Sequence, residues 1–158
     1  MSQNIAQILL QSLEKKNLVL DEIIAQNDLQ EDILKQENLD MDALDASVQK
    51  IGDLVEELEK LDDGFESVYD RVRTEIMENK SMYRAEITQM QENIQQITDK
   101  VVKINAARMR NQLRAENHFK QKAGEIKQAV SKTKVANNYY NNMNKLNYVA
   151  PQFYDNKK

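Results

Sequence analysis

The fold class is decided by residues 44–76, which read LDASVQKIGDLVEELEKLDDGFESVYDRVRTEI. The apolar positions recur at alternating steps of four and three residues: Leu44, Val48, Ile51, Val55 and Leu58, then Phe65, Tyr69, Val72 and Ile76. This spacing is typical of an α-helix that packs along one face, as in a coiled coil. Asp62 occupies a position where the pattern expects an apolar residue, so Asp62-Asp63-Gly64 predicts a local kink or rewinding. We expect one helix over residues 41–78.

Two further amphipathic segments flank this helix. The first covers residues 3–36, with a weaker face at Asn27 and Gln30. Its apolar positions include Ile5, Ile8, Leu9, Leu13, Leu20, Ile23, Ile24, Ile33 and Leu34. The third segment repeats the steps of four and three through Tyr83, Ile87, Met90, Ile94, Ile97, Val101 and Ile104, and continues irregularly through Met109, Leu113, Phe119, Ile126 and Val130.

Short breaks separate the three segments. Asp40 is placed to cap the second helix, and Leu39 and Leu44 are spaced for a hydrophobic staple across that cap. Asn79-Lys80-Ser81 is the next turn, with Ser81 as a candidate cap. Because all three segments have helical spacing, we predict an all-α fold. Short connections favour antiparallel neighbouring helices. The expected architecture is an elongated antiparallel helical hairpin or a three-helix coiled-coil bundle over residues 1–130.

Composition supports this fold class. The chain of 158 residues has only three glycines and one proline, which argues against a sheet protein with many turns. Residues 1–80 carry a net charge of -12 and residues 81–158 a net charge of +8, so we expect an acidic helix to lie against a basic one. There is no cysteine and no apolar run long enough to span a membrane. We therefore expect a cytoplasmic protein.

The sequence offers no pattern of catalytic chemistry. His118 is the only histidine and cysteine is absent, which argues against a zinc site, and the scattered glycines form no phosphate-binding loop. We expect no enzyme activity, no cofactor and no metal. The basic residues after Lys100 have only Phe119 among them as a base-stacking aromatic, and the apolar face there is sparse. We therefore expect neither nucleic-acid binding nor stable membrane insertion.

Residues 131–158 differ from the rest of the chain in being rich in asparagine and tyrosine. We predict a conditionally helical, partner-binding tail, since Tyr139, Met143 and Leu146 keep helical spacing while Pro151 discourages a helix beyond Ala150. The alternative is a tail that folds back to cap the bundle. The candidate partner-binding residues are Ile126, Val130, Val135, Tyr139, Tyr140, Met143, Leu146, Tyr148, Val149, Phe153 and Tyr154.

Three stretches together resemble a known family. They are KKNLVLDEIIAQNDLQEDIL (15–34), DALDASVQKIGDLVEELEKLDDGFESVYDRV (42–72) and ANNYYNNMNKLNYVAPQFYDNKK (136–158). They resemble the small helical flagellar export chaperones of the FlgN/FliT type, and the last stretch is similar to the ends of such proteins from Gram-positive bacteria. The resemblance covers nearly the whole chain.

The resemblance implies a cytoplasmic export chaperone. Such proteins hold hook–filament junction subunits, or the filament cap, before export through the flagellar type III apparatus. Their C-terminal helical region embraces an amphipathic terminal helix of the client, prevents premature assembly, and helps to dock the client on the export gate. The resemblance also points to Tyr139 and Tyr140 as residues that contact the client or the gate. The alternative function is a self-associating coiled-coil scaffold, a homodimer or higher oligomer held by the patterns at 44–76 and 83–104.

Overall fold

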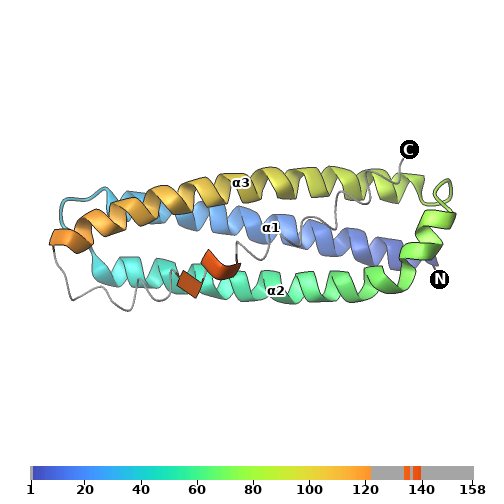
Figure 1. Ribbon diagram of the computed structural model, residues 1–158, viewed down its shortest axis with the longest axis horizontal. Coiled ribbons are helices and arrows are strands. Elements are labelled where there is room, and N and C mark those ends of the chain that lie inside the picture. The colour runs from blue at the N-terminus through green and yellow to red at the C-terminus, as the bar shows by residue number, and fades with distance from the viewer. Residues whose placement is uncertain (1, 122–133, 136, 140–158) are drawn as a thin grey trace.

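The protein is a bundle of three long helices. The computed structural model describes residues 2–121, 134–135 and 137–139, in which α1 spans Ser2–Leu34, α2 spans Met41–Glu78 and α3 spans Arg84–Gln121. Figure 1 shows the three helices lying lengthwise beside one another, so the bundle is elongated. The prediction of an all-α three-helix fold is confirmed, and the limits of the second helix are those expected from the sequence.

The first helix lies in the middle. α1 packs against both α2 and α3 along its length, and Figure 1 shows it between them. α1 and α2 are antiparallel, as the short connection between them predicted. α1 and α3 run parallel: Asp21 meets Lys100, and farther along both helices Glu31 meets Arg114. These two ion pairs join the acidic first half of the chain to its basic second half, as the charge distribution predicted.

The apolar patterns of the second and third helices form the core. All five positions from Leu44 to Leu58 are buried, as are Tyr69, Val72 and Ile76, while Phe65 is half-buried against them and stacks on Tyr69. Tyr83, just before α3, and the six positions of α3 from Ile87 to Ile104 are buried as well. In α1, Ile8 is exposed although the pattern placed it on the apolar face. Because the patterns of α2 and α3 are buried within one chain, they do not offer a surface to a second chain.

The connection between α1 and α2 matches its prediction. The side chain of Asp40 accepts a hydrogen bond of 3.1 Å from the backbone N–H of Ala43, so Asp40 caps α2. Leu39 packs in a small cluster with the buried residues Leu34, Leu44 and Val48. This cluster closes the end of the bundle where α1 stops and α2 begins.

The connection between α2 and α3 differs from its prediction. Asn79 ends α2, with its backbone N–H and its side-chain amide both donating to the carbonyl of Glu75. α3 begins only at Arg84, so Ser81 lies in the turn instead of at the helix cap. The backbone N–H groups of Met82 and Tyr83 bond to the Asn79 carbonyl, and these bonds hold the turn before the helix starts.

Asp62 has a structural reason to interrupt the apolar pattern of α2. The Nζ atom of Lys16, a buried residue of α1, lies 2.7 Å from Oδ1 of Asp62, and both side chains are largely shielded from water. The hydroxyl of Tyr139 donates to the other carboxylate oxygen, Oδ2, at 3.1 Å. α2 continues as a helix through Gly64, and Figure 1 shows its last turns inclined toward the start of α3. Asp62 therefore ties α1, α2 and Tyr139 together.

We predict that Asp62→Ala destabilises the protein by about 3 kcal/mol, since it leaves the Lys16 ammonium buried without its partner. Urea denaturation followed by circular dichroism measures this change. Asp63→Ala, which removes the neighbouring exposed carboxylate, is the matched control and should cost less than about 0.5 kcal/mol. The double variant Lys16→Met/Asp62→Leu should recover most of the loss. Equal losses of stability in Asp62→Ala and Asp63→Ala would contradict this role for Asp62.

Candidate partner-binding surfaces on α3

The side of α3 that faces the bundle becomes polar after Ile104. After Ile104 the steps of four and three continue through Arg108, Asn111, Ala115 and His118, in place of Met109 and Leu113. Asn111 is buried, whereas Met109 and Leu113 are exposed. The irregular continuation predicted through Met109 and Leu113 is therefore wrong. Asn111 and His118 keep the spacing of the buried side, but a pattern of apolar residues does not include them because their side chains are polar.

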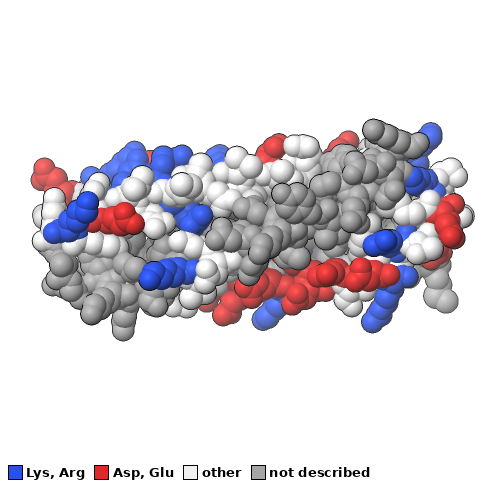
Figure 2. Space-filling model, viewed as in Figure 1, with Lys and Arg blue, Asp and Glu red and all other residues white. Residues whose placement is uncertain are grey.

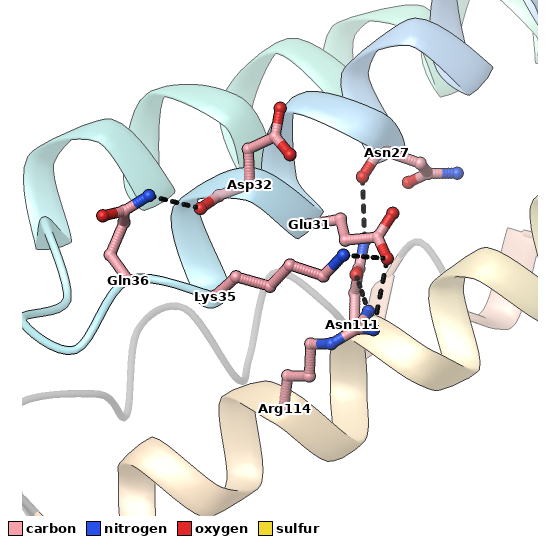
Figure 3. A network of polar contacts seen from close by, with 7 residues as sticks. All are labelled: Asn27, Glu31, Asp32, Lys35, Gln36, Asn111 and Arg114. Carbon is pink, nitrogen blue, oxygen red and sulfur yellow. Dashed lines mark hydrogen bonds and ion pairs between the residues drawn. The ribbon is translucent and has the colours of Figure 1, made fainter.

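Polar contacts join this part of α3 to the end of α1 (Figure 3). The side-chain amide of Asn111 donates to the backbone carbonyl of Asn27 at 3.0 Å and approaches Oε1 of Gln30 at 3.4 Å. Nε2 of His118 lies 2.9 Å from the carbonyl oxygen of Leu34, the last residue of α1. Carbonyls in the last turn of a helix have no partner within the helix, so His118 supplies one.

Glu31 is the charged centre of the same network. Its Oε1 atom lies 3.3 Å from Nζ of Lys35 and 3.1 Å from Nη2 of Arg114, and Figure 3 shows the carboxylate between the two cations. The hydrogen bond and charge of Lys35, and then the charges of Arg114 and Arg110, lower the pKa of the Glu31 carboxyl below its ordinary value. The network therefore holds an ionised Glu31 at neutral pH.

A pocket of about 190 Å³ opens beside this network. Its apolar lining comes from Leu34 of α1, Leu44 and Val48 of α2, and Ala115 and Phe119 of α3. Polar groups at the pocket include Arg108, which hydrogen-bonds Asn137, and Lys134. Polar side chains, Glu116 among them, make up the rest of the lining, so the pocket suits an inserted apolar side chain with a polar neighbour.

An apolar stripe runs along the outside of α3. Val102, Met109 and Leu113 are 64%, 59% and 61% exposed, and exposed Ala106 completes steps of four, three and four. Residues 100–121 carry six lysines and arginines and one acidic residue, and Lys103, Arg110 and Lys120 among them are exposed. Figure 2 shows Lys and Arg side chains gathered over this half of α3, and a row of Asp and Glu side chains along α2. An exposed stripe at helical spacing is the form of surface that binds another amphipathic helix.

The predicted tail residues fall mostly outside the described part of the chain. Tyr139 is 5% exposed and belongs to the main core cluster, whereas Val135 is 67% exposed. For Tyr139 itself, the contact with Asp62 matches the alternative in which the tail folds back on the bundle. The other predicted residues lie outside the described residues, as does the boundary at residue 130: Ile126, Val130, Tyr140, Met143, Leu146, Tyr148, Val149, Phe153 and Tyr154.

Within residues 2–121 and the short described segments after them, no group of three His, Cys, Asp or Glu side chains is placed to hold a metal ion. In that same part of the chain, no helix has the length and apolar character needed to cross a bilayer. Comparisons of the chain with protein families, with curated proteins and with solved structures found no match.

The lowered pKa of Glu31 predicts a pH dependence of stability. A carboxyl whose pKa is lower in the folded state stabilises the fold above its unfolded pKa, and this contribution is lost as the pH falls through the folded pKa. Glu31→Gln should therefore flatten the fall in stability below the ordinary glutamate pKa of about 4.5. Urea unfolding at a series of acidic pH values measures the free energy of unfolding of each variant, with Asp32→Asn as the control. An unchanged acid limb in Glu31→Gln would contradict the ion pairs.

The buried amide of Asn111 predicts a second effect on stability. Asn111→Ala leaves the Gln30 amide and the α1 backbone without their α3 partner and removes buried volume, so we expect a loss of about 1–3 kcal/mol. The control is Asn117→Ala, which alters an exposed asparagine of the same helix and should be nearly neutral. Chemical denaturation of both variants at neutral pH makes the comparison. A neutral Asn111→Ala would show that the polar contacts do not hold the two helices together.

Proposed function

We propose that the protein is a cytoplasmic export chaperone that binds an amphipathic terminal helix of a flagellar hook–filament junction or filament cap subunit. It keeps this subunit from assembling prematurely and delivers it to the flagellar type III export gate. The observation that carries the proposal is the exposed stripe of Val102, Ala106, Met109 and Leu113 on α3. The kind of client comes from the resemblance of the sequence to flagellar export chaperones.

The stripe supports helix binding for a physical reason. The buried sides of α2 and α3 already fill the interior of the bundle, so the outer stripe is apolar surface beyond what the fold itself uses. Its positions span about three helical turns, which matches the anchors that an amphipathic helix offers at i, i+4 and i+7. A client helix lying here would cover its own apolar face, which is the face that drives assembly between subunits.

The charge around the stripe supports an acidic client helix. Exposed Lys103, Arg110 and Lys120 line the same half of α3, and Arg114 is engaged with Glu31. Like charges along a binding face disfavour a basic partner and increase the rate of encounter with an acidic one. The client helix we propose is therefore apolar on one face and acidic beside it.

The pocket at the end of the bundle supports a second anchoring point. It lies among Leu34, Val48 and Phe119, on the same half of α3 as the stripe. An apolar side chain of the client that entered this pocket would fix the position of the client along the bundle. The contribution of Tyr140 and the other tail residues to the client or the gate stays a prediction.

The binding proposal is tested with point variants of the full chain. Met109→Glu/Leu113→Glu places two charges in the stripe and should weaken binding to purified junction or cap subunits at least tenfold, since each anchor contributes about 1.5 kcal/mol or more when buried. Isothermal titration calorimetry measures the affinity, and circular dichroism checks that helicity is kept. Gln89→Glu/Gln96→Glu adds the same charges at exposed positions of α3 outside the stripe and should bind normally. Failure of the unaltered chain to bind either kind of subunit would overturn the proposal.

A further inference from the structure

The outer face of α1 carries a stripe that matches the stripe on α3. Leu18 and Leu29 are 65% and 49% exposed, and Ala25 between them is exposed as well. Leu18, Ala25 and Leu29 are separated by seven and four residues, which is also the spacing of Val102, Met109 and Leu113. Two helices with the same spacing of apolar residues can interleave these residues when they pack side by side.

The charges beside the two stripes are of opposite sign. The α1 stripe is flanked by the exposed acidic residues Glu14, Glu22, Asp28 and Asp32, with Lys15 as the one exposed cation between Ser12 and Leu34. The α3 stripe is flanked by the exposed cations Lys103, Arg110 and Lys120, with the exposed acids Asp99 and Glu116 at its two ends. Pairing the α1 face with the α3 face therefore brings unlike charges together, whereas pairing two α3 faces would bring like charges together.

The two stripes of one chain do not face each other. On the helical wheel of α3, Met109 and Leu113 lie on the side opposite to Asn111 and His118, which contact α1. On α1, Leu18 lies outside the side formed by Lys16 and Asn17, which face α2 and α3. The complementary faces are therefore available only to different copies of the chain.

We propose that this protein associates with itself by packing the acidic outer face of α1 from one copy on the basic outer stripe of α3 from another. Because the contact joins unlike surfaces, the copies associate head to tail. The contact uses none of the apolar positions at 44–76 and 83–104, which are buried inside each bundle. It needs no client and competes with a client helix for the same α3 stripe, but sedimentation of the chain alone tests it without any flagellar subunit.

Sedimentation velocity of the full chain tests the self-association. The weight-average mass should rise with protein concentration at about 0.1 M salt and fall toward that of the monomer at about 1 M salt, because the screening length shortens from about 10 Å to about 3 Å. Charge reversal then identifies the surfaces. Glu22→Lys/Asp28→Lys on α1, and separately Lys103→Glu/Arg110→Glu on α3, should each weaken association about tenfold.

Combining the α1 and α3 charge reversals should restore the association. An equimolar mixture of the two double variants, and the chain that carries all four substitutions, should both associate again, because each pairs an acidic face with a basic one. Glu56→Lys/Glu57→Lys makes the same charge change on the exposed face of α2 and should associate like the unaltered chain. A chain that stays monomeric at all concentrations, or one whose association survives each reversal, would overturn the proposal. In the first case an acidic helix of another protein would remain as the occupant of the α3 stripe.

Discussion

The bundle depends on the packing of α1 against two helices at once. A helix with one neighbour buries a stripe, whereas a helix between two neighbours buries more than half of its circumference. The buried set of α1 accordingly includes Lys16, Asn17 and Asn27 beside its apolar residues. The side chains of Lys16 and Asn17 meet Asp62 on α2 and Asn93 on α3, and the backbone carbonyl of Asn27 accepts from the Asn111 amide on α3.

These polar contacts fix how the helices are aligned. Apolar side chains at steps of four and three can interleave in several registers, because every turn of the pattern is alike. A buried ammonium or amide has its partner in only one of these registers, and elsewhere it would be left without a hydrogen bond. The ion pair of Lys16 with Asp62 therefore sets α2 against α1, and the contacts of Asn17 and Asn111 set α3 against α1.

The two halves of the bundle differ in a way that bears on binding. From Ile87 to Ile104 the inner side of α3 is mostly apolar, with Gln91 as a buried polar residue, whereas from Arg108 to His118 it makes hydrogen bonds to the last turns of α1. The pocket and most of the exposed stripe, from Ala106 to Leu113, belong to this second half. A helix interface held by polar contacts and fewer apolar ones separates at a lower free-energy cost than a tightly packed apolar one. Fewer buried apolar side chains therefore hold this half of α3 to the bundle.

The helices, the break before α2 and most of the inner faces follow from the sequence alone, because the period of apolar residues and the capping chemistry of Asp40 are local properties. The sequence also marked Asp62 as an exception to the pattern. Only the packing of the folded chain set α1 at the centre and brought Asp62 to Lys16 and Tyr139. It also decided that Met109 and Leu113 face outward while Asn111 and His118 face inward. The physical reason is that periodicity tells which side of a helix is buried only where that side is apolar, and it does not tell which helix covers it.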